Sequence, residues 1–170
     1  MKRLFSLVLV FALMGCASIK NEYVGIEGKT NVKQISEESV LELFESGTGV
    51  LLFSFPESEW CQDIMPIINE IALSSEVEVS YFNVRDIRQS NTEEYQSMYL
   101  EIVEYLKTTE FDELLYSEIF VPTLIKIENG EIVDFHLGTT TNHVETSTGL
   151  PELNSAQEQE LNSIINRILS

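Results

Sequence analysis

Positive charge is scarce in this sequence. Lysine and arginine together number 10 among 170 residues, against 28 aspartate and glutamate residues, so the formal net charge is -18. A chain with this balance is repelled by nucleic-acid phosphates and by anionic lipid headgroups. The composition therefore excludes nucleic acid as a partner bound through charge. A hydrophobic fraction of 44% is nevertheless normal for a chain that builds a packed core.

Cysteine and histidine are also scarce, with two residues of each type. The cysteines are Cys16 and Cys61, and the histidines are His136 and His143. These residues do not cluster at a spacing typical of a metal site. We therefore expect no metal and no cofactor. We expect His136 on a strand, with no role that the sequence assigns, and His143 in a solvated polar loop.

The only candidate for a membrane-associated segment is the N-terminus, "MKRLFSLVLVFALMG". Two cations precede an apolar run from Leu4 to Met14, which is shorter than the roughly 20 residues that a spanning helix needs. This arrangement is typical of a signal peptide. The run continues into "LMGC", which resembles a bacterial lipobox and implies cleavage after Gly15 and a lipid on Cys16. The alternative is an ordinary secretion signal followed by an incidental cysteine.

Lipidation at Cys16 would leave Cys61 as the one free thiol of the mature chain, without a partner for an intramolecular disulfide. We divide the chain into a signal peptide (1–15), a polar tether (16–31) and one domain (32–170). Loss of Lys2 and Arg3 changes the net charge from -18 to -20, so the lipid must hold the protein at the membrane against its own repulsion. The expected location is the extracytoplasmic face of the cell membrane.

Apolar patterning predicts alternating strands and helices in the domain. For example, "GVLLFSF" (49–55) is a continuous apolar run bounded by Gly and Pro, which is typical of a buried strand. The order βαβαβαββα predicts an α/β protein with a mixed sheet and helices on both faces. Helices are expected at 36–47, 60–75, 91–115 and 155–169, and strands within 17–33, at 49–55, at 77–87 and as a hairpin within 120–138, turning at "ENGE".

Three features carry a resemblance to the thioredoxin family: "WC" at a helix start after an apolar strand, Pro66 five residues after Cys61, and "VPTLIKIENGEIV". The chain most resembles lipid-anchored, thioredoxin-like proteins of Gram-positive bacteria with a "FPECPWC"-type site. The resemblance implies a thioredoxin-like fold over residues 32–169, with 91–117 as a helical insertion. It also implies that the Val121–Pro122 peptide bond is cis and that Pro122 lies against Cys61.

Thioredoxin-like sites carry Cys-x-x-Cys at a helix N-terminus, and this chain fits that motif in two registers. Either Cys61 is the first cysteine and Ile64 replaces the second, or Cys61 is the second and Ser58 replaces the first. In the family the proline follows the second cysteine by five residues. The position of Pro66 therefore favours the Ser58 register, with Trp60 beside the site.

The loss of the first cysteine limits the chemistry of the site. The first cysteine of such a motif is the exposed nucleophile, and the second resolves the mixed disulfide. Ser58 can cap the helix but cannot form a disulfide. Two hypotheses remain open: a degenerate redox or peptide-binding accessory module, and a monothiol oxidoreductase acting through Cys61. The partners would be an extended peptide or a thiol-containing protein, and Cys61 could equally be an inert core residue.

The lipobox hypothesis predicts that the protein is lipidated at Cys16. Cells grown with a labelled fatty-acid precursor should transfer the label to the native protein, and replacement of Cys16 with Ala should abolish the labelling, because the acceptor thiol is then absent. Label that persists on the Cys16→Ala protein would show that the hypothesis is wrong.

Overall fold

The computed structural model describes residues 19–89, 92–107 and 119–170. These form one five-stranded sheet with the strand order β1-β3-β2-β4-β5. The strands β1, β3 and β2 are parallel to one another, whereas β4 runs antiparallel to both β2 and β5. The bounds are η1 Ile19–Asn21, β1 Val32–Gln34, α1 Glu37–Ser46, β2 Gly49–Ser54, α2 Glu59–Ser75, β3 Val79–Asn83, α3 Arg85–Gln89, α4 Glu93–Lys107, β4 Thr123–Glu128, β5 Glu131–Leu137 and α5 Ser155–Leu169.

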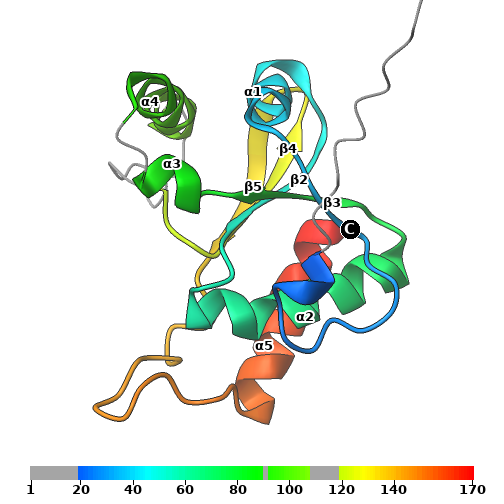
Figure 1. The fold of residues 1–170 in the computed structure, drawn as a ribbon. Coiled ribbons are helices and arrows are strands. Elements are labelled where there is room, and N and C mark those ends of the chain that lie inside the picture. The colour runs from blue at the N-terminus through cyan, green and yellow to red at the C-terminus, as the bar shows by residue number, and fades with distance from the viewer. Residues whose placement is uncertain (1–18, 90–91, 108–118) are drawn as a thin grey trace, which may run out of the picture.

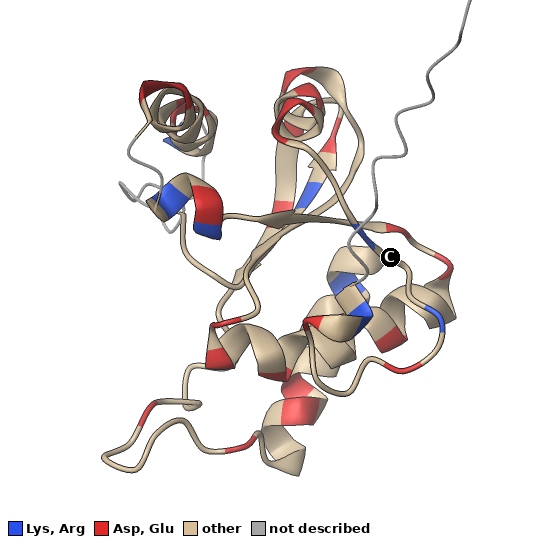
Figure 2. Ribbon diagram, viewed as in Figure 1, with Lys and Arg blue, Asp and Glu red and all other residues tan. Residues whose placement is uncertain are grey.

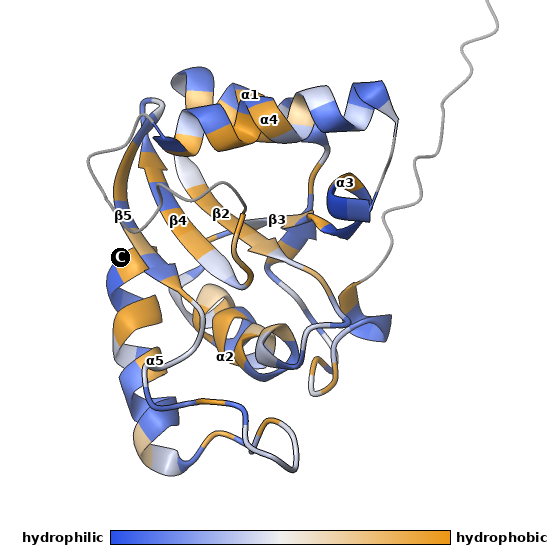
Figure 3. Ribbon diagram, turned by 90° about the vertical axis from the view of Figure 1, so that its left-hand side faces the viewer, coloured by the Kyte–Doolittle hydropathy of each residue, from blue (hydrophilic) through white to orange (hydrophobic). Residues whose placement is uncertain are grey.

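Helices cover both faces of the sheet (Figure 1). The helices α1, α3 and α4 lie on one face, and α2 and α5 lie on the other. Because side chains alternate across a strand, β2 contributes to both cores: Val50 and Leu52 pack on the α2 side, and Leu51 and Phe53 pack on the α1 side. Figure 3 shows apolar positions along the sheet and on the helices that face it. The burial of β2 on both faces explains its continuous apolar sequence.

The Val121–Pro122 peptide bond, directly before β4, is cis, as expected. With the strand order, the terminal hairpin and the helices on both faces, this confirms the prediction of an α/β, thioredoxin-like mixed sheet. The helix α4 occupies Glu93–Lys107 of the expected insertion 91–117, and positions 108–117 lie outside the described residues. Within the described residues, no helix is long and apolar enough to cross a membrane.

Two expectations need correction. The strand expected at 77–87 ends at Asn83, because the Asn83 side chain accepts a hydrogen bond from the Arg85 backbone N–H at 3.0 Å and the chain turns into α3. The described part of the expected tether, 19–31, is packed against the domain. Ile19, Tyr23 and Ile26 are buried in the core on the α2 side.

The hairpin turn between β4 and β5 contacts the end of α1. Asn129 and Gly130 both have positive φ, as the two central residues of a type I′ turn require. The Gly130 N–H donates a hydrogen bond to the Gly47 carbonyl at 2.8 Å. A Cβ atom at position 130 would lie 2.8 Å from the Phe44 carbonyl oxygen, which is closer than real Cβ contacts. Glycine is therefore required here for both backbone conformation and space.

We predict that Gly130→Ala lowers the free energy of unfolding by about 2–4 kcal/mol, because it combines positive φ with a backbone clash. Gly138→Ala is the matched control. Gly138 also has positive φ, at 71°, but a Cβ there would meet nothing within 4 Å, so we expect a loss of only about 1 kcal/mol. Urea unfolding of the two variants measures both values, and equal losses would contradict the proposed clash.

Candidate functional site

The helix α2 begins at Glu59, shortly after the central strand β2 ends at Ser54. Ser58 is its N-cap residue, and the Ser58 hydroxyl accepts a hydrogen bond from the Cys61 backbone N–H at 3.4 Å. The expectation that Ser58 caps this helix is confirmed. The side chain of Ser58 is half-buried, whereas Cys61 lies within the first turn and Ile64 lies a turn further along, in the core. Ser58 is thus at the helix N-terminus, where the partial positive charge of the helix dipole is greatest.

Cys61 is completely buried, with an exposed fraction of 0%. Burial raises the pKa of the Cys61 thiol above its ordinary value, because the thiolate would lose its hydration. Hydrogen bonds from Ser54, Ser58 and the Phe55 backbone, together with the charge of Arg88, oppose this effect without cancelling it. The thiol is therefore protonated at neutral pH, and it has little nucleophilic character.

A chain of buried hydroxyl groups lies beside Cys61. The Tyr23 and Ser54 hydroxyl oxygens are 2.9 Å apart, and Tyr23 also donates a hydrogen bond to the Tyr81 hydroxyl at 3.2 Å. The two tyrosine rings meet edge to face, with centroids 5.9 Å apart. Burial raises the pKa of both tyrosines far above the usual range, so both hydroxyls stay protonated. These contacts satisfy polar groups that would otherwise be costly inside the core.

Gln62 fastens the N-terminal segment to the start of α2. Its side-chain amide donates hydrogen bonds to the carbonyls of Glu22 at 2.9 Å and Pro56 at 2.6 Å. Its carbonyl oxygen accepts a hydrogen bond from the Val24 N–H at 2.9 Å. Residues 22–24 are therefore held over the helix turn that contains Cys61. Sequence reasoning missed both Tyr23 and Gln62.

The cis-proline loop leads into β4, which pairs directly with β2. Pro122 is buried, and its carbonyl accepts a hydrogen bond from the Gly138 N–H at 2.8 Å. The Thr123 hydroxyl donates to the Phe120 carbonyl at 2.8 Å. These bonds fix both sides of the cis peptide bond. The packing of Val121 against both cores places the loop at the end of the sheet where α2 begins, although the contact expected between Pro122 and Cys61 stays a prediction.

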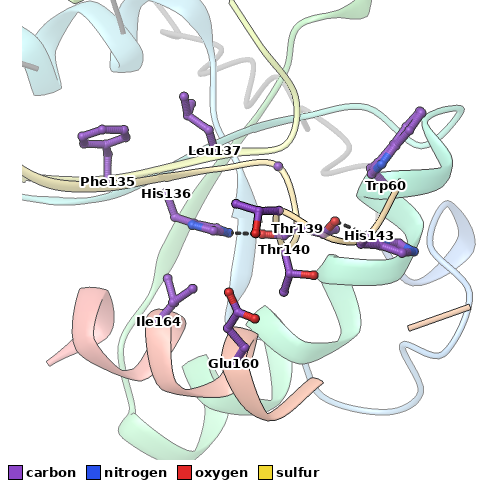
Figure 4. A pocket seen from close by; sticks show the side chains of 11 residues that line it. Trp60, Phe135, His136, Leu137, Thr139, Thr140, His143, Glu160 and Ile164 are labelled. Carbon is purple, nitrogen blue, oxygen red and sulfur yellow. Dashed lines mark hydrogen bonds between the residues drawn. The ribbon is translucent and has the colours of Figure 1, made fainter. Parts of the chain in front are cut away.

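A pocket of about 540 Å³ lies between α5, the end of β5 and the residues that follow it. Trp60 lines this pocket, and so the residue next to Cys61 faces a cavity rather than the core. Figure 4 shows the His136 ring, Ile164 and the Glu160 carboxylate gathered on the α5 side. The other lining residues are Phe135, Leu137, Gly138, Thr139, Thr140, Thr141 and His143.

The two histidines have separate structural roles. His136 lies on β5, as expected, and its Nε2–H donates a hydrogen bond to the Thr139 carbonyl at 2.6 Å. Burial lowers the pKa of His136, so the ring is neutral at neutral pH. His143 was expected in a solvated loop, but it is buried, which corrects that expectation. Its Nε2–H donates to the Pro151 carbonyl at 2.7 Å, and its Nδ1 is 2.7 Å from the Thr139 hydroxyl.

Asp63 on α2 lies near the same loop. Its Oδ2 is 3.6 Å from His143 Nε2. Burial raises the pKa of the Asp63 carboxyl, while His143 acts in the opposite direction. Among the described residues, no group of three or more His, Cys, Asp or Glu side chains could hold a metal ion. The hydrogen bonds of His143 with Thr139 and Pro151 tie together the loop after β5.

No protein-family model matches this sequence, and no curated protein matches it. Solved structures of thioredoxins do resemble it. A thioredoxin from Aeropyrum pernix is 18% identical, with a TM-score of 0.42, over 62% of this chain and 74% of that one. An oxidised thioredoxin from Plasmodium falciparum is 14% identical, with a TM-score of 0.44, over 84% of this chain and 100% of that one.

A third structure, thioredoxin O2 from Arabidopsis thaliana in the oxidised state, is 13% identical, with a TM-score of 0.45. It aligns with 85% of this chain over 100% of its own length. Similarities at this level assign no activity to the chain, so its function must be argued from its own residues.

The raised pKa of Cys61 predicts that stability falls as pH increases. The folded protein holds the thiol proton more tightly than the unfolded chain, whose cysteine titrates near pH 8.5. The contribution is therefore fully present below about pH 8.5 and is lost as pH rises through the higher folded pKa. We expect urea unfolding between pH 7 and 10 to show this decline, and Cys61→Ala to reduce its slope. Identical slopes in the two proteins would contradict the raised pKa.

Proposed function

We propose that this protein is a membrane-anchored, extracytoplasmic, thioredoxin-like accessory module that binds an extended peptide and does not carry out dithiol exchange. The observation that carries the proposal is the start of α2. Ser58 occupies the N-cap, and Cys61 is buried behind it with a raised thiol pKa. The helix end that could activate a nucleophile therefore presents a hydroxyl, whose pKa is far too high for the helix dipole to produce an alkoxide.

Catalysis by Ser58 as a hydroxyl nucleophile is also unsupported by its surroundings. A serine nucleophile needs an adjacent general base. The Ser58 hydroxyl instead accepts a hydrogen bond from the Cys61 N–H. Both histidines donate their Nε2–H groups to backbone carbonyls of residues that follow β5, Thr139 and Pro151. This arrangement favours a capping role for Ser58 and a binding role for the site as a whole.

The proposed peptide would lie beside the cis-proline loop, near Trp60. Extended peptides commonly bind through backbone hydrogen bonds to a sheet edge or strand end, while side-chain pockets supply specificity. Two features support this location: the fixed Val121–Pro122 loop and the pocket lined by Trp60. The lipid on Cys16, proposed from "LMGC", would hold the domain at the membrane surface.

Monothiol exchange through Cys61 is the alternative. It requires the thiol to reach a disulfide in a partner protein or small thiol, and to attack it as a thiolate. An exposed fraction of 0% and a raised pKa both oppose this step. The alternative therefore needs the segment around Tyr23 to move away, and the following experiment tests for such activity in the native protein.

We predict that Ser58→Cys forms a disulfide with Cys61 and gives the protein measurable disulfide-exchange activity. The new thiol would sit at the helix N-terminus, where its pKa should be below the free-cysteine value of about 8.5. Ile64→Cys is the matched control, because Ile64 lies in the core and belongs to the competing register. Free thiols are counted before and after mild oxidation, and reduction of a test disulfide is followed in both variants.

Exchange activity in Ile64→Cys but not in Ser58→Cys would favour the register in which Cys61 is the first cysteine and Ile64 replaces the second. Catalytic activity in the unmodified protein would overturn the accessory-module proposal and support the monothiol alternative. Absence of a disulfide in Ser58→Cys, with the fold intact by circular dichroism, would contradict the geometry proposed for the site.

A further inference from the structure

The pocket beside Trp60 has features that select a particular ligand, and this inference rests on the proposed peptide-binding function. Its volume of about 540 Å³ is large enough to admit a long side chain. Its walls combine apolar surface with a single carboxylate, Glu160. Figure 4 shows this carboxylate pointing from α5 toward His136 and Thr140.

The charge of Glu160 is not neutralised by an ion pair within the described part of the chain. Within residues 19–89, 92–107 and 119–170, its side chain forms no hydrogen bond or ion pair, and it acts on His136 only through its charge. His136 is neutral at neutral pH because burial lowers its pKa. Arg167, on the same helix, is engaged by Asp134, with Nε 3.1 Å from the carboxylate. The negative charge of Glu160 thus remains available to a ligand.

The surroundings of the pocket are acidic as well. Glu59 and Glu152 are exposed, and they belong to α2 and to the loop before α5. Figure 2 shows acidic residues along the first turns of α5 and at the start of α2. Such a surface attracts cations and repels anions before contact is made. Glu160 and the negative charges around the pocket therefore both favour a positively charged ligand.

Trp60 and Ile164 add apolar contacts to this electrostatic preference. A lysine or arginine side chain has an aliphatic stem that packs on apolar surface, and a charged end that stays near carboxylates or aromatic rings. We propose that this pocket binds a basic side chain of the extended peptide whose backbone lies beside Pro122. Trp60 would contact the stem, and Glu160 would pair with the charged end.

The test uses Trp60 as its own reporter, because it is the only tryptophan in the chain. Nα-acetyl-lysine methylamide and Nα-acetyl-norleucine methylamide are titrated into the full-length protein in mild detergent, and tryptophan emission is followed. The two probes share the same apolar stem and differ by the charged amine. We expect the lysine probe to bind about three- to fivefold more tightly, since Glu160 is exposed and an exposed ion pair contributes on this scale.

Glu160→Gln should reduce this preference to less than about twofold. Glu158→Gln is the matched control: it removes the same charge from the same helix, but it lies two positions away and does not line the pocket. It should keep the preference. Equal affinities for the two probes in the native protein, a preference that survives Glu160→Gln, or no change in Trp60 emission with either probe would overturn the inference.

Two octapeptides that differ only by lysine or norleucine at one position separate this inference from the proposed function. Tighter binding of the lysine peptide, reduced by Glu160→Gln, supports both. Equal binding of the two peptides overturns the basic-side-chain pocket and leaves peptide binding in place. Selective binding of the small lysine probe, with neither peptide bound, overturns the peptide-binding function and keeps the pocket.

Discussion

The structure around the site depends on one buried hydroxyl group. The strand β2 is buried on both faces, and it ends in Ser54, whose exposed fraction is 0%. A buried hydroxyl without a partner would destabilise the fold by about 1–3 kcal/mol. Tyr23 supplies one partner, beside the Cys61 thiol, and the Tyr23 hydroxyl also donates to Tyr81. The segment after the proposed lipid attachment site is therefore part of the core, and the thiol of Cys61 is enclosed as a consequence.

Because Cys61 is enclosed, the serine at position 58 has a different role from that of an exposed cysteine there. An exposed cysteine at a helix N-terminus would be activated by the helix dipole, with a buried partner ready to resolve the mixed disulfide. Here the helix end is occupied by a good capping group, and Cys61 behaves as a small apolar residue with a polar edge. Pro122 and the start of α2 keep their positions at the end of β2, and position 58 carries a hydroxyl in place of a thiol. In the proposed binding role, this geometry would hold a peptide without a reactive group.

Local sequence signals predicted most of the fold because they agree with tertiary packing. The turn at Asn129–Gly130 and the closing helix, with its Asn154 capping box, are specified by residues within a few positions. The features that sequence reasoning missed depend on distant partners. The segment 19–31 is polar on average, and the burial of Tyr23 becomes apparent only once Ser54 and Tyr81 are placed beside it. His143 was likewise expected in solvent, because its hydrogen bonds come from a loop whose path the sequence does not specify.

The same limit applies to the pocket, whose walls come from three separated parts of the chain: the start of α2, the end of β5 with its following loop, and α5. Sequence motifs identified Trp60 through its neighbour Cys61, but nothing local connects it with Glu160. The loop after β5 is held by His143, and without that anchor the wall opposite α5 would have no fixed position. In the proposed pocket, the selectivity for a peptide side chain would therefore depend on this anchored loop more than on Ser58 and Cys61. Such a division would let the proposed peptide selectivity operate without a cysteine at position 58.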